Sequence, residues 1–232
     1  MKDTDNEIND DCLVIVPVYN GEETITKTIK NLEKYFKNIL VINDGSDDCT
    51  LDLIKNNNLK FINHLINIGQ GGALESGMLF FIKKTNFKYL ITFDADGQHI
   101  AKEAFSLLSE LKNKKAYACI GSRFKNKNIK IPLIKRIILK LACIYEKFFF
   151  SIKLTDAHNG LRAISRDLVK NNLLPLKNYD MSHATEISHK ICLSGKHFIE
   201  YPVNILYDEK ASQSPLNGIN ILLRLFLKFN GF

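Results

Sequence analysis

Short apolar runs alternate with amphipathic stretches in the first half of the chain. Five runs have the length and the bounding turn residues of buried strands; they cover residues 12–16, 39–42, 59–62, 89–93 and 116–121. Between them, apolar residues recur at helical spacing, which predicts helices over residues 24–36, 48–56, 72–84 and 100–111. This order predicts an α/β fold in which a mostly parallel central sheet is flanked by helices.

Polar clusters follow three of the predicted strands, at residues 17–22, 43–47 and 94–99. The carboxyl ends of parallel strands share one edge of a sheet, and ligands bind there. Asp94 and Asp96 stand one residue apart directly after a strand, and paired carboxylates suit a hard cation such as Mg²⁺. The alternative is an ordinary Asp-rich turn.

The other clusters carry groups that suit a nucleotide. Asp44 can accept hydrogen bonds from a base or a ribose, although an Asx turn explains it equally well. Tyr19 offers a ring on which a base can stack, and Asn20 and Glu22 can reach sugar hydroxyls. The glycines of residues 67–72 come too late for a dinucleotide-binding fingerprint, so we favour a loop that approaches phosphate at a helix start.

Composition narrows the class of protein. The chain has 232 residues with 45% hydrophobic and 25% charged residues, which suits one packed domain. Five scattered cysteines without a C-x-x-C pair argue against a disulfide framework and a zinc site. Because residues 1–11 are polar, we expect no signal peptide. We therefore expect the protein in the cytoplasm.

The positive charge is concentrated in one segment. Residues 125–153 hold eight basic residues against one acid, Glu146, and so match the net charge of +7. Such a block indicates an anionic partner, either nucleic acid or a membrane surface. Residues 132–150 and 216–229 are amphipathic and basic. Both stretches suit helices that lie in a membrane interface or, alternatively, helices that cover the sheet or a dimer contact.

Six motifs in order resemble one known family. They are V-P-V-Y-N-G-E (16–22), N-D-G-S-D-D (43–48), N-I-G-Q-G-G-A (67–73), D-A-D-G-Q-H (94–99), G-S-R-F (121–124) and D-A-H-N-G-L-R-A (156–163). From about residue 12 to 207 the chain resembles the family 2 glycosyltransferases of GT-A fold, most closely the dolichyl- and undecaprenyl-phosphate sugar transferases. The resemblance implies a single domain over residues 1–232, with a nucleotide-sugar half (12–124) and an acceptor half (125–232).

The resemblance also implies residue roles. It places a nucleotide-sugar donor on Pro17, Tyr19, Asn20, Glu22, Asp44, Gly69, Asp94, Ala95 and Asp96. It implies a Mg²⁺ or Mn²⁺ ion on Asp94, Asp96 and Gln98, and catalytic roles for Asp96, Arg123, Arg162 and Glu186. One departure is Gln70, where many relatives have Lys.

The expected reaction is inverting transfer of a sugar from a UDP- or GDP-sugar to a polyprenyl phosphate or another lipid-linked acceptor in cell-envelope glycan synthesis. A phosphate acceptor is already a nucleophile, whereas a glycan hydroxyl needs a general base. Glu186 falls where the family places that base, and its alternative role is to complement a helix N-terminus.

Two other classes of protein fit the sequence less well. A sugar nucleotidyltransferase would show a basic phosphate loop after the first strand, where residues 17–22 hold no Lys or Arg. A non-catalytic nucleic-acid-binding protein leaves the acidic strand ends unexplained, because clustered carboxylates repel phosphate. No nucleic-acid partner is therefore expected.

Overall fold

The computed structural model describes residues 10–126, 133–150, 152–156, 159–180 and 182–206. Within them one sheet of seven strands has the order β3-β2-β1-β4-β6-β5-β7. The strands are β1 (Cys12–Val18), β2 (Ile39–Asn43), β3 (Phe61–Asn63), β4 (Tyr89–Thr92), β5 (Ala118–Ser122), β6 (Arg162–Ser165) and β7 (Phe198–Pro202).

The helices of the first half agree with the periodicity of apolar residues. The described helices are α2 (Ile25–Leu32), α3 (Thr50–Asn56), α4 (Gln70–Lys84), α5 (Ala101–Asn113), α6 (Leu133–Phe150), α7 (Arg166–Leu168) with a π-helical turn η1 (Val169–Leu173), and α8 (His183–Leu193). The helix expected over residues 24–36 ends earlier, at Leu32. The amides of Tyr35 and Phe36 both donate to the carbonyl of Leu32, so the chain turns there while Phe36 still reaches the core.

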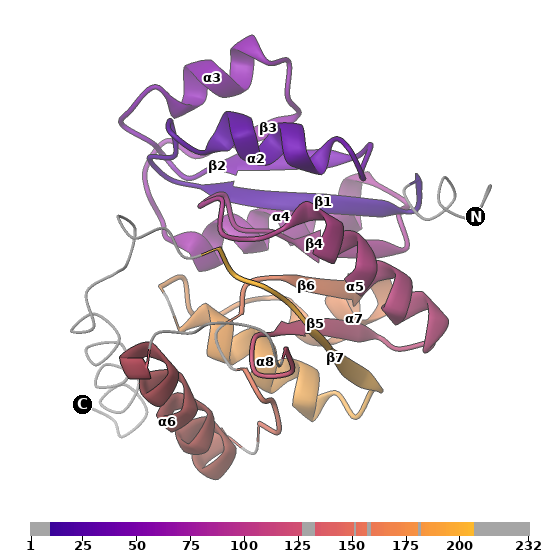
Figure 1. Ribbon diagram of the computed structural model, residues 1–232. Coiled ribbons are helices and arrows are strands. Elements are labelled where there is room, and N and C mark those ends of the chain that lie inside the picture. Colours follow the sequence, from indigo (N-terminus) through magenta and orange to yellow (C-terminus); the bar gives the residue numbers. More distant parts are fainter. Residues whose placement is uncertain (1–9, 127–132, 151, 157–158, 181, 207–232) are drawn as a thin grey trace.

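Two layers of helices enclose the sheet because side chains alternate along its strands. In β1, Val14 and Val16 belong to the core cluster that α2 and α5 complete, whereas Leu13 and Ile15 belong to the cluster that α4 and α8 complete. Figure 1 shows α2 and α5 in front of the sheet and α4 behind it. The α/β prediction of a mostly parallel sheet flanked by helices is confirmed.

The antiparallel strand β6 was not predicted, since its four residues are too short to stand out by periodicity. It lies between β4 and β5 and runs against both, whereas β1 pairs in parallel with β2 and β4, and β5 pairs in parallel with β7. In this register Arg162 lies opposite Thr92 of β4 and Ile120 of β5. The segment before β6 is thereby brought to the edge where β4 ends.

Helix α6 forms within the predicted amphipathic stretch, but its apolar residues divide between two faces. Leu139 and Ala142 are buried, whereas Ile137 and Leu141 are exposed. The acidic residue Glu146 lies on the buried face. In the described part of the chain, no helix combines the length and the apolarity that crossing a membrane requires. The second predicted amphipathic stretch, residues 216–229, lies outside the described residues.

Candidate active site

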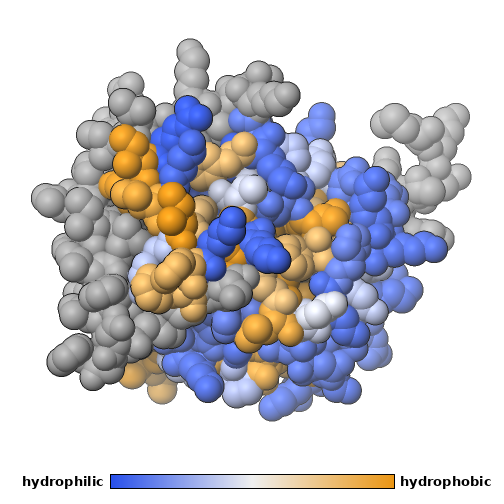
Figure 2. Space-filling model, turned by 90° about the horizontal axis from the view of Figure 1, so that it is seen from below, coloured by the Kyte–Doolittle hydropathy of each residue, from blue (hydrophilic) through white to orange (hydrophobic). Residues whose placement is uncertain are grey.

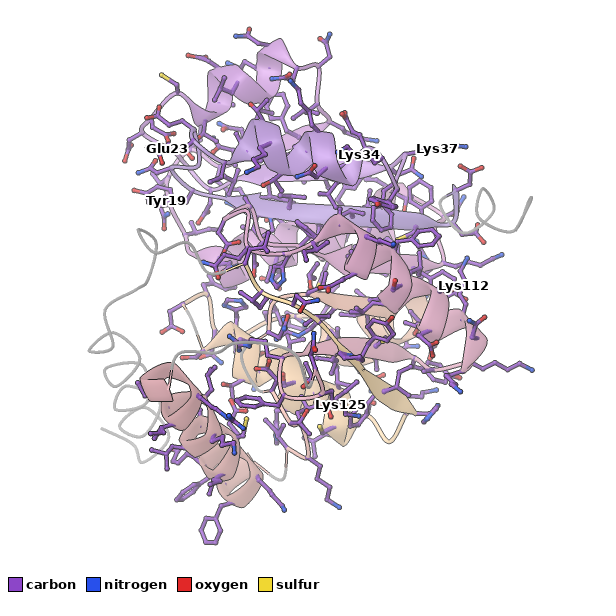
Figure 3. The ribbon with its side chains drawn as sticks, in the orientation of Figure 1. Tyr19, Glu23, Lys34, Lys37, Lys112 and Lys125 are labelled. Atoms are coloured by element: carbon purple, nitrogen blue, oxygen red, sulfur yellow. The ribbon has the colours of Figure 1, made fainter. Side chains whose placement is uncertain are left out.

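The three polar clusters meet at one edge of the sheet, as expected. Strands β2, β1 and β4 are direct neighbours, and the amide of Asp44 donates to the carbonyl of Val18 at 2.8 Å. Figure 3 shows Tyr19 and Glu23 at this edge, whereas Lys37 and Lys112 lie at the opposite end of the sheet. The site edge therefore combines the residues that follow β1, β2 and β4.

Hydrogen bonds join the loops after β1 and β2. The side-chain oxygen of Asn20, a residue with a left-handed φ of 50°, accepts from the amide of Asp47 at 2.9 Å. The carboxylate of Glu22 accepts from the amide of Cys49 at 3.0 Å. The Tyr19 hydroxyl donates to Asp47 at 3.2 Å, while 47% of the Tyr19 surface stays exposed. Asn20 and Glu22 thus shape the loop that presents the Tyr19 ring.

Asp44 is 2% exposed and holds the segment between β3 and α4. Its Oδ1 lies 2.7 Å from His64 Nδ1 and accepts from the amide of Ile68, and its Oδ2 accepts from the amide of Gly69 at 2.8 Å. Gly69 has φ of 99°, and a Cβ there would meet the carbonyl oxygen of Tyr179. The start of α4 is therefore built around a glycine and the Asp44 carboxylate.

Asp94 lies at the centre of this edge, directly after β4. Its Oδ1 accepts from Gln70 Nε2 at 2.8 Å and its Oδ2 lies 3.2 Å from His99 Nε2. The carboxylate also packs on the backbone of Gly160, where a Cβ would overlap it. Thr92 fixes Gly160 by donating to its carbonyl at 2.6 Å. Gln70, which replaces the Lys of many relatives, thus contacts a carboxylate.

The environment of Asp94 favours its charged form. Burial opposes ionisation, but the hydrogen bond with His99 and the charges of His99, Arg162 and His183 hold the pKa of Asp94 below its usual range. With 25% of its side chain exposed, the ionised carboxylate is accessible from the edge of the sheet. An accessible carboxylate whose pKa is lowered is a suitable ligand for a divalent cation.

Asp96 supplies the second carboxylate of the motif. Ala95 is buried and Asp96 is exposed, while Asp96 Oδ1 accepts from the amide of Gln98 at 2.9 Å. Within the described residues, no group of three or more His, Cys, Asp and Glu side chains is arranged to hold a metal. Two carboxylates fit a Mg²⁺-type ion, which takes one or two protein carboxylates and completes its shell with water and substrate phosphate.

The two arginines differ in their surroundings. Arg123 forms a two-pronged ion pair with Asp156, with Nε–Oδ2 and Nη2–Oδ1 distances of 2.7 and 2.6 Å. Arg162 is 1% exposed and donates to the carbonyl of Ala184 at 3.4 Å. Both guanidinium groups lie inside the protein beside carboxylates, so their expected contact with substrate phosphate stays a prediction.

Glu186 lies on α8 and holds the segment that precedes this helix. Its carboxylate accepts from the amides of Lys177 and Asn178 and from the Asn178 side chain at 2.8–3.0 Å, and Lys190 lies 2.8 Å away. Burial opposes ionisation, but these donors hold the pKa of Glu186 below its usual range. The same segment packs on Gly69 and Gly71 at the start of α4.

Several partners of the site residues were not predicted from the sequence. Gly160 contacts Asp94, Asp156 pairs with Arg123, and Glu146 lies buried near Arg162. Gly160 and Asp156 belong to the motif at residues 156–163, which was an available signal. Nothing in the pattern of α6 marked the single acid among its basic residues as an inward-facing group.

Comparisons with known proteins identify the family of this chain. The family model for glycosyl transferase family 2 matches residues 13–173. An uncharacterized protein of Methanocaldococcus jannaschii is 35% identical over 239 residues, covering 96% of this chain and 94% of that protein. The UDP-N-acetylglucosamine–dolichyl-phosphate N-acetylglucosaminyltransferase of Methanococcus voltae is 31% identical over 244 residues. The match covers 92% of this chain and 94% of that protein.

The fold has solved relatives as well. A crystal structure of glucosyl-3-phosphoglycerate synthase from Mycobacterium tuberculosis, in complex with Mn²⁺ and UDP-glucose, superposes with a TM-score of 0.67 at 15% identity and covers 96% of this chain and 82% of that one. The protein has the GT-A fold, and it belongs to the family 2 glycosyltransferases. Its resemblance to the branch that acts on dolichyl and undecaprenyl phosphate is confirmed.

Proposed function

We propose that this glycosyltransferase moves a sugar, with inversion, from a UDP- or GDP-sugar to a polyprenyl phosphate or another lipid-linked acceptor in cell-envelope glycan synthesis. The observation that carries the proposal is the partly exposed carboxylate of Asp94 at the end of β4, held by Gln70 and His99. The Methanococcus voltae relative, named for transfer of N-acetylglucosamine from a UDP-sugar to dolichyl phosphate, supports the choice of donor and acceptor.

The donor is proposed to lie along the edge formed by β2, β1 and β4. The exposed ring of Tyr19 gives the base a stacking surface, and the loops fixed by Asn20, Glu22 and Asp44 set the width of the base site. Asp94 and Asp96, with Gln98, would hold Mg²⁺ or Mn²⁺. Such an ion neutralises charge on the diphosphate leaving group.

The contacts of Glu186 favour a phosphate acceptor over a hydroxyl acceptor. A general base must accept a proton and works best with a pKa near the operating pH. The carboxylate of Glu186 is instead occupied by the backbone of Lys177 and Asn178 and by Lys190, and its pKa is lowered. A polyprenyl phosphate attacks through an oxygen that is already charged, so no base is required. In that case Glu186 positions the segment before α8.

Helix α6 supports a location on an anionic membrane surface at the cytoplasmic face. One side of the helix exposes a stripe of large apolar residues, Ile137, Leu141, Ile144 and Phe148. Arg136, Lys140 and Lys147 are exposed beside this apolar stripe. Figure 2 shows hydrophobic side chains gathered on the face of the molecule that carries α6. A helix with exposed Phe and Leu flanked by cations suits the headgroup region of a bilayer, where a lipid-linked acceptor resides.

The test is a transfer assay with purified protein and radiolabelled UDP- and GDP-sugars. The assay contains Mn²⁺ or Mg²⁺ and polyprenyl phosphate in anionic vesicles. We expect a labelled glycolipid whose formation stops on chelation of the cation. A matched reaction with a soluble glycan acceptor in place of the lipid tests the hydroxyl alternative. Transfer to the glycan alone would overturn the acceptor assignment, and no turnover of either donor would overturn the proposed function.

A further inference from the structure

The loop between β3 and α4, residues 64–69, is held mainly by polar and backbone contacts. Leu65 is 95% exposed and Ile66 is 70% exposed, so neither side chain anchors the loop in the core. The backbone of the loop packs on the segment after β2, where a Cβ on Gly45 would meet Ile66 and Asn67. A loop without an apolar anchor depends on hydrogen bonds to keep one conformation.

His64 begins this loop, and both nitrogens of its ring have partners. Nδ1 lies 2.7 Å from Asp44 Oδ1, and Nε2 lies 3.0 Å from Ser76 Oγ of α4. The His64 side chain is 13% exposed. Because the Asp44 carboxylate also accepts from the amides of Ile68 and Gly69, it acts as an acceptor, and Nδ1 supplies the proton of the contact. The Ser76 hydroxyl can donate or accept, so it suits Nε2 in either form of the ring.

These contacts close a circuit from α4 back to its own first residue. The circuit runs from Ser76 through His64 and Asp44 to the two amides that directly precede α4. Gln70, the first residue of α4, donates to Asp94 at 2.8 Å. Successive hydrogen bonds therefore connect the His64 ring with the carboxylate at the centre of the site.

Asp44, His64 and Ser76 also stand in the order that activates a serine nucleophile in hydrolases. The place of Ser76 in the fold argues against that use. Ser76 lies within α4, so the amides beside it are engaged in helical hydrogen bonds. None of these amides is left to stabilise an oxyanion, which such catalysis requires. The three groups therefore fix a position and do not activate the hydroxyl.

We propose that His64 is a positioning residue of the donor site. By donating to Asp44 while Ser76 holds its other nitrogen, His64 keeps the loop of residues 64–69 and the start of α4 in the arrangement that accepts a nucleoside diphosphate. The inference rests on the proposed function, because it assumes that the donor lies along the edge formed by β2, β1 and β4. It goes further by assigning a role to His64 and Ser76, which lie outside the sequence motifs of the site.

Two measurements on the full chain without ligand test the positioning itself. Nitrogen NMR spectra of the His64 ring should show a proton on Nδ1. The amides of Ile68 and Gly69 should exchange hydrogen at least about tenfold faster in His64→Leu than in the wild type, because the ring no longer holds Asp44. Exchange within β1 should stay unchanged. A ring without a proton on Nδ1, or equal exchange of both amides in wild type and variant, would overturn the proposal.

Ser76→Ala provides a second variant if His64→Leu does not fold. It frees only Nε2 and keeps the contact between His64 and Asp44. We expect a smaller acceleration of exchange at Ile68 and Gly69 than full removal of the ring would give. Exchange at these two amides that is unchanged in Ser76→Ala would contradict the circuit.

Nucleotide affinity shows whether this position matters to the donor site. Titration calorimetry measures the binding of UDP and of GDP, each with Mn²⁺. We expect His64→Leu to raise Kd about tenfold, as when a competent arrangement is populated for about a tenth of the time. His64→Asn keeps an N–H donor for Asp44 and should recover most of the affinity. His197→Leu, the same substitution at an exposed histidine before β7, is the matched control and should bind as the wild type does.

The rescue by His64→Asn separates positioning from a general contribution to folding. Equal nucleotide affinity of wild type and His64→Leu would overturn the proposal. A loss of affinity that His64→Asn does not recover, at a melting temperature equal to that of His64→Leu, would overturn it as well.

The transfer assay on the same preparations separates this inference from the proposed function. Because saturating donor selects the competent arrangement, His64→Leu should raise the donor KM about tenfold and keep kcat within about twofold of the wild type. Nucleotide binding that depends on His64, without any transfer of sugar, would remove the proposed function alone. Transfer of sugar with an unchanged donor KM in His64→Leu would remove the inference alone.

Discussion

Gly160→Ala tests how tightly the backbone before β6 constrains Asp94. A Cβ at this position would overlap Oδ1, Oδ2 and Cγ of Asp94, so the carboxylate must move. Moving it breaks the hydrogen bonds with Gln70 and His99. Overpacking costs about 1–3 kcal/mol and hydrogen bonds to a charged group about 1.5–3 kcal/mol. Because the chain relaxes in part, we expect a net loss of about 2–3 kcal/mol in unfolding free energy, guided by those ranges.

Gly160→Ala should lower both the turnover and the stability of the protein. Displacing a reacting or metal-binding group by about 1 Å lowers rates by about 10²-fold, and a loss of 2–3 kcal/mol lowers the melting temperature by roughly 5–10 °C in a chain of this size. Calorimetric melting and the transfer assay measure the two effects.

A double-mutant cycle isolates the contact between Gly160 and Asp94. In an Asp94→Ala background no carboxylate remains for the new Cβ to meet, so Gly160→Ala should cost little stability there. An equal cost of Gly160→Ala in both backgrounds, or wild-type melting and turnover in the single variant, would refute the reasoning.

Three further predictions concern the remaining groups. The lowered pKa of Glu186 means that its stabilising effect is complete above the unfolded-state pKa and is lost as the pH falls through the folded-state pKa. In urea, the unfolding free energy of Glu186→Gln should therefore be about 1–3 kcal/mol lower than that of the wild type at pH 7, and this difference should shrink in acid. Transfer to lipid by Glu186→Gln should stay near normal; a loss of about 10²–10⁴-fold in rate would instead identify Glu186 as a general base. Arg123→Ala leaves Asp156 buried without its fork of donors, so calorimetry should show a loss of about 3–5 kcal/mol, and an unchanged melting temperature would contradict the ion pair. Replacing Leu141 or Phe148 by Asn should reduce sedimentation with anionic vesicles at an unchanged melting temperature, and undiminished binding would exclude α6 as the contact.

The sequence predicted the first half of the fold well because its strands are uninterrupted apolar runs. Residues 12–16 and 39–42 have few polar interruptions, and both became buried parallel strands. Strand β6 has four residues and contains Arg162, which is buried and lies within the electrostatic influence of carboxylates from three other segments. Local periodicity carries no information about such long-range compensation, so this antiparallel strand was found only in the structure.

In the candidate site, too, residues with a local sequence signal were predicted and residues whose role depends on long-range packing were not. Asp94 was predicted because a carboxylate pair after a strand is a local signal, and the sheet order places it beside the end of β1, the strand that separates β4 from β2. The inward direction of Glu146 depends on which face of α6 the rest of the protein covers. The sequence pattern predicted an amphipathic helix within residues 132–150 with residues 134, 137, 138, 141, 145, 148 and 149 on one apolar face. In the structure Ile137 and Leu141 face outward and Glu146 faces inward. A helix with apolar residues on most sides does not reveal its buried face by periodicity alone.

The most direct test of the central claim compares cation-dependent transfer by the wild type and by Asp96→Ala. Asp96 is exposed, so its replacement should leave folding intact and remove one carboxylate from the donor site. We predict an unchanged melting temperature with a loss of at least about 10²-fold in transfer from the nucleotide-sugar donor. A folded Asp96→Ala protein that transfers sugar at the wild-type rate, with the same dependence on Mn²⁺, would contradict the account.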